Sequence, residues 1–266
     1  MQPLSNVSIK YPAVGRCIYC GDEGSKLSTE HIVPFALEGR LELPEASCGK
    51  CALETGRIEQ FLARDIAKPF RAKHKFRTRR KSQMPESFSL FVKRGDETIG
   101  ATVPIEKHPG TLLLPIFSSP RLLLGEERHP DPLWTIGVWH YPDIKDVETA
   151  YRSVGSTSTD KVFVGPLRID VTVRSIAKIA HAACAATRSL DGYQPLLTEI
   201  ILGTDRVFGH WIGGAESRPA GVKLHEINIQ HAVYREREYL MCDVRLFSNL
   251  GAPTYRAFVG RRPPPV

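Results

Sequence analysis

The spacing of apolar residues along the chain predicts a few amphipathic helices separated by alternating, strand-like runs. One helical stripe lies in the first quarter of the chain, and Pro69 is expected to end that helix. This stripe consists of Leu53, Ile58, Phe61, Leu62 and Ile66. A second stripe predicts a helix over 174–189 that ends before Gly192. Its members are Ile176, Ile179, Ala180, Ala183, Cys184 and Thr187.

Strand-like segments dominate the rest of the chain. SFSLFVKRGDETIGATVPI, at 87–105, predicts a hairpin around a Gly-Asp turn. LRIDVTV, at 167–173, alternates strictly between apolar and polar residues, which predicts a half-buried strand leading into the second helix. Further strands are expected in the segments HEINIQHAVY, EYLMCDVRLF and TYRAFVG. The fold class predicted from this pattern is α+β.

The chain is predicted to have two parts joined by a basic segment. Residues 1–70 hold the first helix and four of the six cysteines and form the predicted zinc lobe. Residues 71–81 join it to a larger, sheet-based α+β domain at 82–266. No apolar stretch approaches the ~18 residues of a membrane helix. The N-terminus lacks the features of a secretion signal, so we expect a soluble, cytoplasmic protein.

The positive charge of the chain is concentrated in the basic segment, residues 71–81. The formal net charge is +7, and RAKHKFRTRRK alone carries seven Lys and Arg and no acid, so the remainder sums to zero. Such a segment can neutralise the phosphates of a nucleic-acid backbone. A solvated linker or a targeting signal is the alternative interpretation. The predicted nucleic-acid-binding residues are Arg71, Lys73, Lys75, Arg77, Arg79, Arg80 and Lys81.

Four cysteines form two Cys-x-x-Cys pairs, Cys17/Cys20 and Cys48/Cys51. Each pair offers two thiolates at the spacing that a tetrahedral zinc ion requires. A small lobe has little hydrophobic core, so a bound ion would supply much of its folding free energy. Four free cysteines in a core are the alternative. We therefore predict a structural zinc site.

An acid and a histidine stand side by side between these pairs, in the run STEHIVPF. A carboxylate such as Glu30 can hold a hard divalent cation, and the imidazole of His31 can accept a proton from water at neutral pH. Hydrolysis of a phosphodiester uses both groups. Without the surrounding cysteine pairs, a strand-end acid beside a hydrogen-bonded histidine would be the favoured interpretation.

The order CIYCG, STEHIVPFALEGR, SCGKCALETGRIE, over roughly residues 15 to 65, resembles the zinc-containing branch of the HNH endonucleases. The resemblance implies a ββα-metal, treble-clef-like fold with His31 on the first strand as general base. It also implies Glu30 as a ligand of a catalytic Mg²⁺ or Mn²⁺ ion. The four cysteines would form a structural zinc site outside the chemistry.

One position departs from the family pattern. Ala52 follows the last cysteine, where the family places an Asn or His that helps to bind the catalytic metal. Glu54 or Glu59, on the following helix, is a possible substitute. The resemblance implies a metal-dependent endonuclease acting on DNA. The alternatives are a zinc module that binds nucleic acid without cleaving it, and a structural or protein-interaction lobe.

Other candidate residues are assigned to structure. Cys184, on the apolar stripe of the second helix, is expected to be a buried core residue with His181 on its flank. His225 and His231 are expected at the surface. The segment 209–217, GHWIGGAES, is expected to be a turn. Residues 82–266 show no catalytic group of residues and are assigned to target binding, regulation or assembly.

Overall fold

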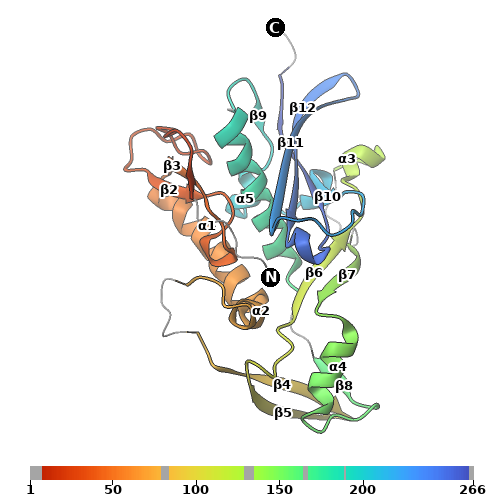
Figure 1. Ribbon diagram of the computed structural model, residues 1–266. Helices are drawn as coiled ribbons and strands as arrows, with labels where there is room; N and C mark the ends of the chain where they lie inside the picture. Colours follow the sequence, from red (N-terminus) through yellow and green to blue (C-terminus); the bar gives the residue numbers. More distant parts are fainter. Residues whose placement is uncertain (1–7, 79–83, 129–134, 164–166, 189, 264–266) are drawn as a thin grey trace.

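The computed structural model describes residues 8–78, 84–128, 135–163, 167–188 and 190–263, and the fold is mixed α+β (Figure 1). The cysteine-rich part begins with a three-stranded sheet in the order β1-β3-β2, followed by a helical stretch. Its elements are β1 Ile9–Lys10, β2 Ser28–His31, η1 Phe35–Leu37, β3 Leu41–Ser47, α1 Gly49–Phe61, the π-helical η2 Leu62–Ile66 and α2 Lys68–Lys73.

The first predicted helix is confirmed, but it does not end at Pro69. A π-helical turn follows α1, and a new helix, α2, then carries Pro69 near its start. Proline is tolerated there because the first amides of a helix have no partner within the helix. The basic segment therefore begins inside α2, and Phe76 beyond it is buried.

The middle of the chain forms two small antiparallel sheets. The predicted hairpin is confirmed as β4 and β5, and Gly95 at its turn adopts a positive φ of 61°. Apolar residues of the hairpin pack with α4 in a small core of their own, at the lower end of the view in Figure 1. The elements are β4 Ser87–Arg94, β5 Glu97–Pro104, β6 Leu112–Phe117, α3 Arg121–Leu124, β7 Thr135–Tyr141, α4 Ile144–Arg152 and β8 Lys161–Phe163.

The C-terminal part is built on an antiparallel sheet in the order β10-β13-β12-β11, with β9 paired to β13. The three long strands predicted from the sequence are confirmed as β11, β12 and β13. Segment 209–217 contains a short helix and a strand in place of a simple turn. The elements are α5 Ile169–Arg188, β9 Gln194–Pro195, α6 Thr198–Leu202, η5 Phe208–His210, β10 Ile212–Gly214, β11 His225–Tyr234, β12 Arg237–Leu246, η6 Ser248–Leu250 and β13 Tyr255–Arg261.

The predicted strand at 167–173 is wrong. Helix α5 starts at Ile169, so most of this segment lies at the start of the helix, over about one and a half turns. The alternation of apolar and polar residues led to the wrong prediction because α5 is buried on almost every side. A helix enclosed in this way does not need a single apolar stripe. Val171, Thr172 and Val173 are all buried on it.

Helix α5 lies between α1 on one side and strands β11, β12 and β13 on the other (Figure 1). One continuous core joins residues of the cysteine-rich part, such as Leu37 and Ile58, to Ile176 and Val244. The predicted division at 1–70, 71–81 and 82–266 remains a prediction about domains, and the buried core extends across its boundaries. Within the described ranges, no helix has both the length and the apolar character needed to cross a bilayer.

Two histidines connect the cysteine-rich part to the rest of the core. Cys184 on α5 is buried, as predicted, and His181, which was predicted on the flank of this helix, is fully buried as well; its Nε2 hydrogen-bonds the Ile18 carbonyl at 2.6 Å. His225 is not the surface residue that was predicted, because its Nε2 hydrogen-bonds the Leu37 carbonyl at 2.6 Å and its Nδ1 accepts from the amide of Phe247. His231 is exposed, as predicted.

These two imidazoles make stability dependent on pH. Burial lowers the pKa of His181 and of His225 from 6.5 to about 4, so the unfolded chain binds protons first as the pH falls. The contribution of each neutral imidazole to the free energy of unfolding is complete above pH 6.5. It is lost as the pH falls toward 4, at up to about 1.4 kcal/mol per pH unit. Urea unfolding across this window measures the loss. His225→Gln should reduce the slope, whereas an unchanged slope, as expected for the control His231→Gln, would contradict the assignment.

Candidate metal centre and basic cleft

The four cysteines meet at one point and can hold a metal ion. Their sulfur atoms all lie within 4.8 Å of one another, and Cys20 Sγ lies 3.7 Å from Cys48 Sγ. A tetrahedral zinc ion with bonds of about 2.3 Å holds its sulfur ligands ~3.8 Å apart. The structure thus brings together the cluster that the sequence spacing predicted, with a geometry that suits structural zinc.

Local structure explains how each pair is presented. Cys17 and Cys20 lie in a tight turn that the Gly21 amide closes on the Cys17 carbonyl at 2.8 Å, and Gly21 has a φ of 77° that favours glycine. Cys48 is the N-cap of α1 and Cys51 lies in its first turn. The backbone amide of Cys51 lowers the pKa of the Cys48 thiol, which favours the thiolate form that binds metal.

His31 stands at the end of β2 and faces an open cleft. Its side chain is 20% exposed, and its Nε2 lies 3.8 Å from Oε1 of Glu42, its cross-strand neighbour on β3. A carboxylate beside the ring stabilises the imidazolium that forms when the ring accepts a proton. The ring also meets Phe35 edge-on. His31 therefore combines access to water with a partner for its protonated form.

Glu30 points into the interior, away from this cleft. Its side chain is buried and its Oε1 lies 2.6 Å from Nζ of Lys178, which reaches it from α5. Lys178 Nζ also lies 2.6 Å from Oε1 of Glu59 and donates to the carbonyls of His31 and Ile32. Burial opposes the charge on Lys178, but the two carboxylates outweigh it and raise its pKa.

This arrangement does not fit the role predicted for Glu30 as the ligand of a catalytic divalent ion. Burial raises the pKa of Glu30 in spite of Lys178, and its bound partner is the ammonium. Glu59, one of the two proposed substitutes, shares that ammonium and also lines the cleft. Glu54, the other, pairs with Arg57 on the surface of α1. Ala52 offers no ligand atom.

The cleft beside His31 has a volume of about 780 Å³, and most of its charged lining residues are basic. One wall is formed by His31, Phe35 and Ala36, and the other by the helical stretch from α1 to α2. Arg64 is exposed and Lys68 half-buried, one helical turn apart on that second wall. The other charged lining residues are Glu59, Arg71 and Arg77.

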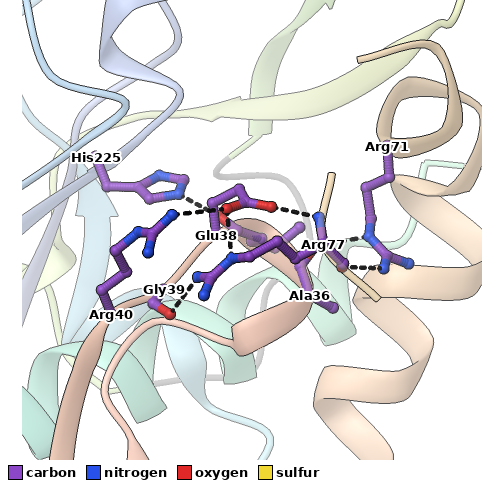
Figure 2. Close-up of polar contacts among 8 residues, drawn as sticks. Ala36, Glu38, Gly39, Arg40, Arg71, Arg77 and His225 are labelled. Carbon is purple, nitrogen blue, oxygen red and sulfur yellow. Dashed lines mark hydrogen bonds and ion pairs between the residues drawn. The ribbon is translucent and has the colours of Figure 1, made fainter. Parts of the chain in front are cut away.

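Two arginines of the basic segment hold the loop after His31 (Figure 2). Arg71 is buried, and its guanidinium donates to the carbonyls of Ala36, at 2.6 Å, and Ala63, at 3.0 Å. Arg77 pairs with the carboxylate of Glu38 at 2.7 Å and also donates to the Gly39 carbonyl. These contacts fix one wall of the cleft and leave little of either guanidinium for phosphate.

The remaining predicted nucleic-acid contacts are divided. Lys73 donates to the carbonyls of Ile105 and Glu106, whereas Lys75 is exposed. Arg79, Arg80 and Lys81 lie outside the described residues. The structure therefore adds two cations that the sequence analysis missed, Arg64 and Lys68. Their spacing of four residues, in line with Glu59 and Gln60 on a helical surface, was the available signal.

Gly39 shows how tightly this loop is built. A Cβ at this position would lie 1.8 Å from the carbonyl oxygen of Val33, so no other residue fits without moving the backbone. Glu38, the preceding residue, has a φ of 68° and pairs with both Arg77 and Arg40. The run from Val33 to Arg40 is thus fixed in shape, and it carries Phe35 beside the ring of His31.

No protein-family model, no curated protein and no solved structure matches this chain in comparisons of its sequence and fold.

The metal centre leads to a first test on this site. Cys48→Ser should reduce bound zinc well below one equivalent and lower the free energy of unfolding by several kilocalories per mole, because structural zinc contributes folding free energy directly. Metal analysis and urea unfolding measure both effects. Cys184→Ala, which alters a cysteine buried outside the cluster, is the control and should keep its zinc. Equal zinc content in both variants would exclude the site.

Proposed function

We propose that the protein is an HNH-like endonuclease that hydrolyses phosphodiester bonds in DNA at the cleft beside His31. One observation carries the proposal: a partly exposed histidine and several cations line the same cleft of about 780 Å³. An antiparallel pair, β2 and β3, is followed by α1, with one cysteine pair before β2 and the other at the start of α1, and this order supports a ββα-metal, treble-clef-like fold.

In the proposed reaction, His31 takes the proton from the attacking water, whose oxygen bonds to phosphorus as the bond from phosphorus to the leaving sugar oxygen breaks. The leaving oxygen takes a proton from solvent and departs as a hydroxyl, and the imidazolium returns its proton to solvent. Glu42, 3.8 Å from the ring, stabilises the imidazolium that results. Arg64 and Lys68 lie on the opposite wall and hold the phosphodiester by its charged oxygens. The zinc ion has no part in the chemistry and supplies rigidity to the strand and helix that carry these residues.

Phosphate binding by this cleft is independent of base sequence. Lysine and arginine contacts to the backbone fix the position of the duplex but carry no sequence information. The proposal therefore predicts salt-dependent binding of DNA, to which the exposed Lys75 also contributes. Arg71 and Arg77 act mainly by holding the loop that presents His31 and Phe35.

A second candidate function is nucleic-acid binding without cleavage. It is favoured by Ala52 and by the ion pairs of Lys178, which engage both Glu30 and Glu59. On this interpretation the cleft binds the backbone and His31 takes part only in binding. The two functions differ in one measurable outcome, which is cleavage of the bound DNA.

Plasmid cleavage tests the catalytic proposal. The zinc-loaded protein should convert supercoiled plasmid DNA to the nicked form, and His31→Ala should slow this by about 100-fold or more, which is the usual contribution of a general base. Zinc content should stay unchanged. His231→Ala, an exposed histidine away from the cleft, is the control. Unchanged nicking in His31→Ala, or no nicking by the native chain in any buffer, would refute the proposal.

The cations of the cleft lead to a separate test on binding. Arg64→Gln and Lys68→Gln should each weaken DNA binding and lower the slope of log K against log salt by about 0.9, because each removes a phosphate contact. Lys161→Gln, an exposed lysine on β8, is the matched control. Fluorescence anisotropy over a salt series gives the slopes. Equal slopes for all three variants would place the binding surface elsewhere.

A further inference from the structure

The ammonium of Lys178 sits in a cage made entirely of oxygen atoms. Oε1 of Glu30 and Oε1 of Glu59 each lie 2.6 Å from Nζ, and the carbonyl oxygens of His31 and Ile32 complete the set. The ligands come from β2, the residue after it, and α1, whereas the lysine comes from α5. We call these four oxygens the lysine cage.

The lysine cage has the composition of a site for a hard cation. Two carboxylates and two backbone carbonyls are typical ligands of Ca²⁺ and similar ions, which prefer oxygen at about 2.3–2.6 Å. The amine lies in the position where such an ion would sit. The amine lies on the buried side of β2, behind His31, and it donates to the backbone carbonyl of that residue.

The lysine cannot easily leave this position. Its side chain is 1% exposed, and α5 is buried along most of its length. One turn further along the same face, His181 anchors the helix to the Ile18 carbonyl at 2.6 Å. Displaced by an incoming ion, the ammonium would remain buried without acceptors, which is strongly unfavourable.

We propose that Lys178 permanently occupies the cation position behind His31, so that the site works without a divalent ion and becomes a divalent-cation site only when the amine is removed. The first half of this inference rests on the proposed function. Lys178 acts as a positioning residue: it fixes the end of β2 that carries the imidazole, and it offsets the negative charge of Glu59, which lines the cleft.

The native protein provides the first experiment. Zinc-loaded protein is assayed for plasmid nicking in buffer without added divalent ions and in the same buffer with Mg²⁺ or Mn²⁺, with zinc content measured throughout. We expect equal rates with and without the added ion, each reduced by about 100-fold or more in His31→Ala. Nicking that appears only with Mg²⁺ or Mn²⁺ would overturn this inference and leave the proposed function intact. Absence of nicking under every condition refutes the proposed function instead.

A second experiment examines the lysine cage without using activity. Lys178→Ala leaves two carboxylates and two carbonyls around an empty space, and we expect it to bind Mn²⁺, seen by electron paramagnetic resonance and by a rise in melting temperature with added Mn²⁺. The native chain should show neither effect. Lys178→Ala/Glu59→Gln, with one carboxylate fewer, should bind at least tenfold more weakly.

The outcomes of this second experiment are decisive in both directions. Folded Lys178→Ala protein that binds no Mn²⁺ would overturn the inference, and so would native protein that binds Mn²⁺ as tightly as the variant. If Lys178→Ala does not fold alone, its folding in the presence of Mn²⁺ is the expected rescue. If the variant does not fold even with Mn²⁺, Mn²⁺ binding is measured on the native chain instead. Binding by the native chain that is abolished in Glu30→Gln would overturn the inference. If Mn²⁺ restores nicking to Lys178→Ala, this supports a role of Lys178 in positioning His31 beyond its support of the fold.

Discussion

The structure depends on one buried charge. Lys178 extends from the central helix α5 and binds carboxylates that belong to β2 and α1, so a single ammonium ties the strand of His31, the helix of Glu59 and the core helix together. Buried ion pairs add little net stability compared with apolar packing, but removal of one partner costs several kilocalories per mole. The main consequence of Lys178 is therefore that α5, β2 and α1 must keep this arrangement for both acids to retain their partner.

The cations near His31 have two different roles. Arg71 and Arg77 are used inside the protein, where they bind carbonyls and the carboxylate of Glu38 and thereby shape the loop after His31. Arg64 and Lys68 face the cleft. Net charge alone does not separate these tasks, because a guanidinium that fixes a loop and one that meets a phosphate look identical in composition.

The sequence was most informative where a short segment determines its own geometry. The two cysteine pairs and the hairpin of β4 and β5 follow from local spacing, and both appear as expected. The first turns of α5 were misjudged because burial on all sides removes the helical periodicity. The partners of Glu30 were not predictable, since Lys178 lies far along the chain and nothing near it signals an ion pair. His225 was missed for the same reason, since its acceptor is the Leu37 carbonyl.

The order of synthesis gives the position of α5 a further meaning. The cysteine turn, β2 and α1 all precede Lys178 in the chain, so Glu30 and Glu59 are synthesised before the ammonium that pairs with both of them. Neither carboxylate therefore gains this partner until α5 packs against β2 and α1.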